Sequence, residues 1–310
     1  MKKVFIDGEA GTTGLRIRER LAARTDIELV TLPEALRKDA AARKTALNAA
    51  DIAFLCLPDA AAVEAVSMIE NPDTVVLDTS TAHRTDPRFV YGFPELAAEQ
   101  AAHIAASKRI AVPGCHASGF IATVAPLVQH GLLAPDAALT CHSVTGYSGG
   151  GKKMIAAYGE ADRSPLYDAP RQYGLSQTHK HLPEMTAMCG LQSPPIFCPI
   201  VADFYSGMVV TVPLFAGQLA PGATAADVKT VLKAAYGGNI VRYVVTADAD
   251  GFLSAAALSG KDAMEVAVFG SETRILLTAR YDNLGKGASG AAVECMNLVL
   301  GVDPATGLNL

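Results

Sequence analysis

The first third of the chain alternates short apolar segments with segments whose apolar residues recur at helical spacing. Strands are expected at residues 4–7, 27–32, 52–57, 74–78 and 109–112, and helices at 11–23, 39–50 and 60–69. The strand at 52–57 is apolar throughout, as parallel strands covered on both faces are. This β-α-β-α order predicts a doubly wound parallel sheet.

The pattern changes near residue 138, where longer segments follow one another with few helices between them. Strands are expected at 138–143, 200–213, 240–245, 264–271 and 273–281, with a helix at 227–236. Gly207 is interpreted as a bulge in the second of these strands. The segments predict an α+β domain with a mixed, largely antiparallel sheet.

Two domains follow from these patterns. Residues 1–114 form the first domain and residues 115–285 the second. The segment 286–310 contains an Ala- and Val-rich helix at 287–300, which we expect to pack back on the first domain. Residues 146–180 are polar, rich in Gly and Tyr and weakly periodic, which predicts a long functional loop.

Composition narrows the possible functions. Half of the 310 residues are hydrophobic, so a sizeable core can form, and the length fits about two domains. The net charge of −5 includes no basic strip, and Trp is absent, which argues against nucleic acid or a membrane surface as partner. The six cysteines form no C-x-x-C pair, so neither a metal site nor a disulfide framework is expected. We expect a cytoplasmic homo-oligomer, a dimer or a tetramer.

A glycine-rich turn joins the first strand to the first helix. Glycines there allow a tight turn and let the backbone approach a pyrophosphate at the helix N-terminus. The candidate cofactor residues of this turn are Gly8, Gly11, Thr12, Thr13 and Gly14. The turn predicts a dinucleotide-binding domain of the Rossmann type.

Charged residues after the second strand bear on the choice of cofactor. Glu34 stands where an acidic residue binds the ribose 2′-hydroxyl of NAD. Arg37 and Lys38 follow closely and suit the 2′-phosphate of NADP. The residues alone leave both cofactors open.

Cys115 falls where a Pro-Gly turn becomes a helix, because Phe120, Ile121 and Val124 recur at helical spacing after it. The unpaired N–H groups of a helix start favour a thiolate and an oxyanion. A small buried residue is the alternative interpretation of a lone cysteine. The small neighbours Ala117, Ser118 and Gly119 favour a nucleophile.

Two further stretches carry candidate chemistry. Arg84 lies in the loop 78–84 after the fourth strand, where parallel sheets bind ligands, and its guanidinium suits an anion. His179 and His181 precede Pro183, which predicts extended chain, so the two side chains would face the same way. A metal pair lacks an evident third ligand. An acid/base pair serving the thiolate fits better, with Glu184 orienting one ring.

Together these segments resemble the short form of the N-acetyl-gamma-glutamyl-phosphate reductases, the third enzymes of arginine biosynthesis. The resemblance covers nearly the whole chain. It rests on the glycine turn, the 78–84 loop, Tyr-Gly-Phe-Pro-Glu-Leu at 91–96, the cysteine motif at 113–118, residues 148–152, 179–184 and 282–290. His116 departs from the aromatic residue of the longer form. Pro126 is expected to kink the helix.

The resemblance implies NADPH-dependent reduction of an acyl phosphate through a Cys115 thioester. It implies His181 as acid/base held by Glu184, and His179 as a substrate anchor. It also implies substrate contacts by Arg84, Ser118 and Ser148. The remaining expected cofactor contacts are Cys56, Leu57, Ser80, Gly149 and Asn283. Which of His179 and His181 is the acid/base stays open.

Two other classes of function compete with this interpretation. Homologous enzymes reduce aspartyl or aminoadipyl phosphates, and one methylene in a pocket changes affinity by only about 1–3 kcal/mol. A non-catalytic NADP-binding sensor would keep the glycine turn but would need no positioned thiol.

Overall fold

The computed structural model describes residues 1–310, apart from the side chain of Asp250. The chain divides into two compact units, each described here by itself. The first comprises Met1–Gly114 and Ala288–Leu308, and the second comprises Cys115–Gly287 and Asn309–Leu310.

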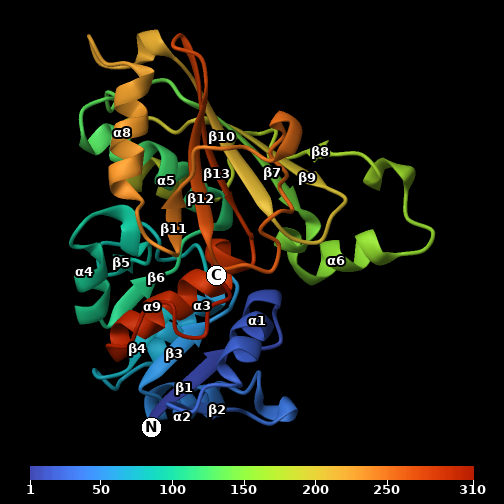
Figure 1. Ribbon diagram of the computed structural model, residues 1–310. Helices are drawn as coiled ribbons and strands as arrows, with labels where there is room; N and C mark the ends of the chain where they lie inside the picture. Colours follow the sequence, from blue (N-terminus) through green and yellow to red (C-terminus); the bar gives the residue numbers. More distant parts are fainter. The chain divides into compact units, whose positions relative to one another are not determined.

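The first unit is built on a six-stranded sheet in the order β2-β1-β3-β4-β6-β5 (Figure 1). Every pairing in it is parallel, which confirms the predicted doubly wound sheet. Its strands are β1 (Lys2–Asp7), β2 (Ile27–Val30), β3 (Ile52–Leu55), β4 (Val75–Asp78), β5 (Val90–Tyr91) and β6 (Arg109–Ala111). Its helices are α1 (Thr12–Leu21), α2 (Ala40–Ala49), α3 (Asp59–Met68), α4 (Gln100–Ala106) and α9 (Gly290–Leu300).

Alternation along β1 sends neighbouring side chains into different cores. Val4 and Ile6 join a cluster with residues of α1, α4 and α9, whereas Phe5 joins a cluster with residues of α2 and α3. Because side chains in a strand point alternately to its two faces, helices cover both faces of this sheet.

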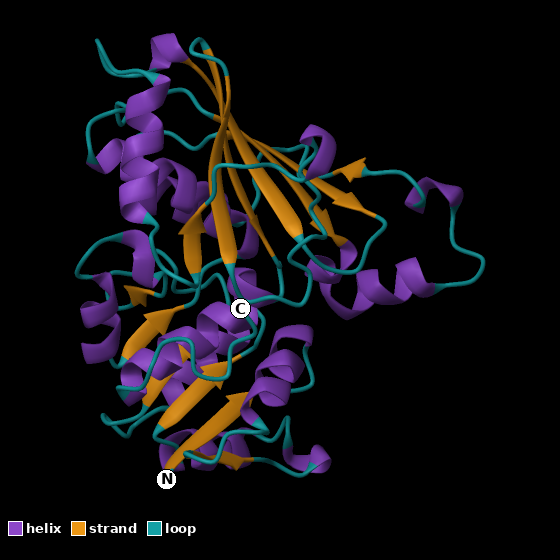
Figure 2. Ribbon diagram, viewed as in Figure 1, coloured by secondary structure: helices purple, strands orange, loops and turns teal.

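The second unit contains a seven-stranded sheet in the order β11-β12-β13-β10-β7-β9-β8, whose strands are labelled in Figure 1 and drawn in orange in Figure 2. Four pairings are antiparallel and two are parallel, which confirms the mixed, largely antiparallel prediction. Its strands are β7 (Thr140–Gly146), β8 (Arg171–Gln172), β9 (Ile196–Ala202), β10 (Met208–Phe215), β11 (Val241–Tyr243), β12 (Met264–Gly270) and β13 (Arg274–Tyr281). Its helices are α5 (Cys115–Gln129), α6 (Gly151–Gly159), α7 (Leu182–Cys189) and α8 (Ala225–Ala235).

Helix α5 is the central helix of the second unit. It packs against β10 and β13 and against α7 and α8, and its residues from His116 to Leu127 are all buried. Pro126 lies inside this helix without ending it. The opposite face of the sheet stays partly open, since buried and half-buried residues alternate along β10 up to Phe215, which is 67% exposed.

Three sequence predictions need correction. The strand expected at 200–213 is two strands, β9 and β10. Gly207 lies between them at φ +113°, where a Cβ would come 2.3 Å from Ala255 O. The loop expected at 146–180 holds α6 and the short strand β8. A π-helical segment, Gly285–Ser289, overlaps the start of the helix expected at 287–300, and α9 begins only at Gly290.

Among the helices described here, none combines the length and the apolar character that crossing a bilayer requires.

Leu77 tests the packing of the first core. Its side chain in β4 is 0% exposed, so Leu77→Ala is expected to lower the free energy of unfolding of the first unit by about 2–5 kcal/mol. Urea unfolding followed by circular dichroism measures the change. Val63→Ala in α3, at a side chain 52% exposed, is the control and should change stability by less than about 0.5 kcal/mol. Equal effects of the two substitutions would contradict this packing.

Candidate functional site

The glycine turn of the first unit has a backbone that only glycine allows. Gly8 has φ +85°, and a Cβ on it would lie 2.3 Å from Cys56 O. A Cβ on Gly14 would lie 2.6 Å from Gly8 O. Thr12 and Thr13 are the first residues of α1, and Gly11 precedes them as its N-cap. The turn therefore brings bare backbone close to the start of α1, as a phosphate cradle requires.

A cavity of about 640 Å³ lies beside this turn. Its size is that of ordinary small-molecule sites. The cavity is lined by residues of the turn, of 32–38 and of β1, α2 and α3, among them Gly8, Glu9, Glu34, Arg37, Lys38 and Leu57. The turn and the cavity together fit the adenosine part of a dinucleotide.

Arg37 is the most informative side chain of the cavity. Its Nη2 lies 2.7 Å from Glu9 Oε1, in an ion pair that holds the guanidinium in place. Its Nε is buried and has no acceptor among the residues that the structure describes. A buried donor without an acceptor costs about 1–3 kcal/mol, so this group favours an anionic ligand.

The sequence did not reveal a second ion pair at the same cavity. Arg43 of α2 donates from Nε and Nη2 to the carboxylate of Asp7, at 2.9–3.2 Å, and both residues are buried. Arg43 Nη1 also contacts Glu64. The pair ties the end of β1, just before Gly8, to α2. The sign of this ion pair in the sequence is Arg43, a charged residue within the predicted Ala-rich helix at 39–50.

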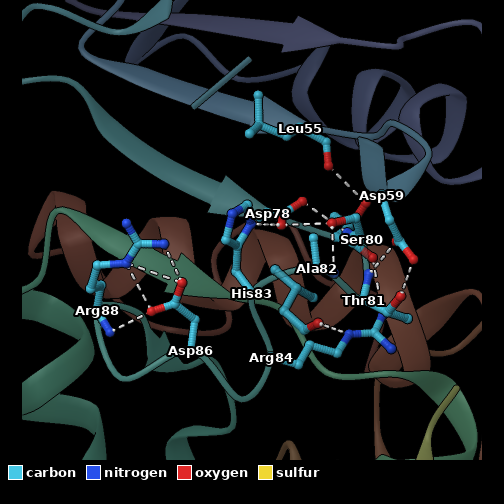
Figure 3. Close-up of polar contacts among 12 residues, drawn as sticks. Leu55, Asp59, Asp78, Ser80, Thr81, Ala82, His83, Arg84, Asp86 and Arg88 are labelled. Carbon is cyan, nitrogen blue, oxygen red and sulfur yellow. Dashed lines mark hydrogen bonds and ion pairs between the residues drawn. The ribbon is translucent and has the colours of Figure 1, made fainter. Parts of the chain in front are cut away.

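The loop after β4 is folded around the buried carboxylate of Asp78 (Figure 3). Asp78 accepts hydrogen bonds from the Ser80 backbone and hydroxyl, and its Oδ2 lies 2.6 Å from His83 Nδ1. Arg84 is buried, and it donates to the carbonyl groups of Val112 and Thr79. Arg84 is therefore a fixed cation rather than a mobile surface side chain.

Cys56 follows β3, beside the glycine turn. Burial raises the pKa of its thiol to about 12, although Thr79 hydrogen-bonds to it. Cys56 is consequently a neutral thiol at physiological pH.

Cys115 is the first residue of α5, as the sequence predicts. The hydroxyl of Tyr281, at the end of β13, donates to the Cys115 carbonyl and accepts from Gly119 N at 2.9 Å. A Cβ on Gly119 would lie 2.7 Å from that hydroxyl, so the contact requires glycine there. Tyr281 thereby clamps the first turn of the helix that carries the thiol.

His179 and His181 lie together, with ring centroids 4.7 Å apart. The prediction of extended chain before Pro183 is wrong, because His181 has helical dihedrals and Pro183 lies in the first turn of α7. Proline suits the start of a helix, where its missing N–H is not needed. The turn at the start of α7, and not the alternation of a strand, brings the two rings together.

His116 supports both rings. It is 3% exposed, its Nδ1 lies 2.6 Å from Ser143 Oγ, and its Nε2 lies 2.7 Å from Tyr173 Oη. Burial, assisted by the charge of His179, lowers the pKa of His116 to about 3. Sequence reasoning does not find Tyr173 or Tyr281, because their contacts span 57 and 166 residues.

The other predicted residues of this unit fall into two groups. Ser118 in α5 and Glu184 in α7 are buried. Ser148, Gly149 and Asn283 are brought together, because Asn283 Nδ2 donates to Ser148 Oγ at 3.0 Å and a Cβ on Gly149 would lie 3.4 Å from the same nitrogen. Within the described residues, no group of His, Cys, Asp or Glu is arranged to hold a metal ion.

Comparisons with known proteins identify the family. Residues 115–283 match the model "Semialdehyde dehydrogenase, dimerisation domain", and residues 33–104 match "Semialdehyde dehydrogenase, NAD binding domain". The N-acetyl-gamma-glutamyl-phosphate reductase of Rhizobium leguminosarum bv. trifolii is 48% identical over 305 residues, which cover 96% of this chain and 98% of that protein. The chain belongs to the semialdehyde dehydrogenase family. Its relatives in that family include the reductase of Sinorhizobium fredii, 46% identical over 303 residues, again with 96% and 98% coverage. The predicted resemblance is confirmed.

Solved semialdehyde dehydrogenases share the fold. Aspartate semialdehyde dehydrogenase II of Vibrio cholerae has a TM-score of 0.71 at 16% identity, with 97% of this chain and 98% of that chain covered. The Candida albicans enzyme, solved with NADP, has a TM-score of 0.65 at 14% identity, with coverage of 97% and 99%. At such identities the likeness concerns the fold, so it does not favour the aspartyl alternative.

His116 gives the second unit a pH-dependent stability. Its pKa is about 3 when folded and about 6.5 when unfolded, so acid protonates the unfolded chain first and favours unfolding. Stability due to this residue is complete above pH 6.5 and falls below it, by about 1.4 kcal/mol between pH 7.5 and 5.5. Urea unfolding at both pH values measures it. His116→Gln should lose that part of the pH dependence, and an unchanged dependence in the variant would contradict the assignment.

Proposed function

We propose that this protein reduces N-acetyl-L-glutamyl 5-phosphate to N-acetyl-L-glutamate 5-semialdehyde and phosphate, with NADPH, in arginine biosynthesis. The observation that carries the proposal is Cys115 at the clamped start of α5, followed by an imidazole that touches both His179 and His181. The names of relatives 46–48% identical over nearly the whole chain support this substrate over the aspartyl and aminoadipyl ones.

The thiolate of Cys115 attacks the acyl carbonyl, and the bond from that carbon to the phosphate oxygen breaks. Phosphate leaves with the electron pair, and a thioester of Cys115 remains. The helix N-terminus stabilises the thiolate and the oxyanion that forms during attack. When bound, NADPH supplies the hydride that reduces the thioester carbonyl.

His181 takes the thiol proton and returns it as the thiolate departs, and Glu184 in the first turn of α7 holds it. His179 anchors the substrate. Arg84, Ser118 and Ser148 bind the substrate's polar groups, with Arg84 suited to an anion because its guanidinium is fixed by two carbonyl groups.

The first unit binds the dinucleotide. The turn from Gly8 to Gly14 receives the pyrophosphate, and Arg37 with Lys38 binds the 2′-phosphate. Glu34 lines the same cavity, but the buried Nε of Arg37 favours an anion there. Further contacts are proposed for Cys56, Leu57, Ser80, Gly149 and Asn283.

The second unit carries the proposed reacting residues and self-association. The open face of its sheet, with Val209, Pro213 and Phe215 along β10, suits a second copy of the chain, and the matched family model is named for dimerisation. We place the enzyme in the cytoplasm as a dimer or tetramer.

Cys115→Ala tests the reaction in reverse. Wild-type protein mixed with N-acetylglutamate semialdehyde, phosphate and NADP should form NADPH in a phosphate-dependent manner, measured by absorbance. Loss of the nucleophile should lower kcat by roughly three orders of magnitude or more. Cys198→Ala, at a half-buried thiol of β9, should keep wild-type activity. Turnover of aspartate semialdehyde instead, or NADP binding without any turnover, would overturn the proposal.

Arg37→Ala tests the cofactor. Losing a charged hydrogen bond of about 1.5–3 kcal/mol should weaken NADPH binding by roughly 10- to 100-fold, whereas NADH binding should change little. Calorimetric titration at fixed ionic strength gives both dissociation constants. Arg16→Ala, which removes an α1 arginine paired with Glu19, is the control and should leave both constants unchanged. An equal loss of affinity for both cofactors would remove Arg37 from the 2′-phosphate site.

A further inference from the structure

His116 lies against both histidines of the proposed acid/base pair. Its ring centroid is 5.7 Å from that of His179, with the planes at 88°, and 5.6 Å from that of His181, with the planes at 49°. Phe197 of β9 packs edge-on against it at 5.3 Å. Because the ring is almost completely buried, it can move only if these neighbours move as well.

Both ring nitrogens of His116 are fastened to the second unit. Ser143 in β7 holds Nδ1, and Tyr173, just after β8, holds Nε2. A neutral imidazole has one donor and one acceptor nitrogen, and each hydroxyl can serve either. Rotating the ring would break two buried hydrogen bonds, so its plane is fixed.

Cys115 and His116 are consecutive residues of α5. The ring that orients the two histidines is therefore attached to the same helical turn as the nucleophile. Because His116 follows Cys115, the orientation of His179 and His181 depends on the position of the thiol and not only on α7.

We propose that His116 is a positioning residue, a neutral imidazole that sets the orientation of His179 and His181 with respect to Cys115. The inference rests on the proposed acid/base role of that pair. In this role His116 does not itself exchange a proton with the substrate.

The groups that face His116 are consistent with a neutral ring. Tyr173, His179 and His181 are titratable groups that face the ring, and Cys115 precedes it in α5. Burial raises the pKa of Tyr173, so that hydroxyl stays neutral. A cation at residue 116 would oppose protonation of the histidines beside it, whereas a neutral ring permits it.

His116→Phe separates ring packing from hydrogen bonding, because it keeps an aromatic ring and removes both nitrogen contacts. A ring that is no longer fixed should misplace the pair, lowering kcat about 10- to 100-fold with KM within about threefold. Tyr173→Phe removes one of the two contacts and should show a smaller change of the same sign. His130→Phe is the matched control. It lies past the other end of α5, about 21 Å along the axis, where its Nδ1 contacts the Pro126 carbonyl.

The deciding readout does not depend on turnover. NMR titration of the imidazole signals of His179 and His181, and the pH dependence of Cys115 alkylation by iodoacetamide, are measured in the free enzyme. In His116→Phe we expect the apparent pKa of at least one group to shift by about half a unit or more, with no shift in His130→Phe. The pH profile of kcat should shift in the same direction.

Wild-type titrations in a folded His116→Phe protein would overturn the proposal, even if kcat fell, because a merely structural role would give that result. If His116→Phe does not fold, Tyr173→Phe decides by the same readouts. Failure of the wild type to turn over N-acetylglutamate semialdehyde would instead overturn the proposed function, and the titrations would still report the coupling.

Discussion

The structure of the second unit depends on one hydroxyl group inserted at the first turn of α5. Tyr281 bonds at once to the Cys115 carbonyl and the Gly119 amide, and it is completely buried. Burial holds its pKa well above the usual value, so the hydroxyl remains protonated and can donate and accept together. Gly119 leaves room for it, and a Cβ on Gly287 would lie 3.1 Å from the Cys115 Cβ. The thiol is therefore placed by the end of β13 as much as by its own helix.

The groups around Cys115 are neutral for a physical reason. Burial raises the pKa of Tyr173 and Tyr281 and lowers that of His116, and in each case it disfavours the charged form. A neutral, poorly hydrated surrounding screens the helix N-terminus less than water would. The N-terminal end of α5 is consequently screened less than it would be in water, and charge changes are left to the proposed reacting groups.

Features set by local backbone were predictable from the sequence, whereas contacts between distant residues were not. The parallel sheet follows from hydrophobic periodicity, the glycine turn from glycine spacing, and the start of α5 from a Pro-Gly turn. Each of these signals involves residues that are close together in the sequence. Two errors have local causes as well. A glycine inside an apparent strand predicts a bulge, but Gly207 separates two strands, and a proline predicts extended chain before it, but Pro183 begins a helix. The hydrogen bonds of His116 and Tyr281 cross 27 to 166 residues, and no periodicity records them.

The proposed choice of NADP over NAD depends on hydrogen bonding, which residue types alone do not show. Glu34 and Arg37 stand three residues apart and both line the cavity beside the glycine turn, so the sequence supports either cofactor. Arg37 is held by Glu9, a residue of the glycine turn itself, and its Nε is buried without an acceptor among the described residues. A ribose hydroxyl would offer that donor a neutral partner, whereas a phosphate offers a charge-assisted one about twice as strong. This difference is the basis for proposing the phosphorylated cofactor.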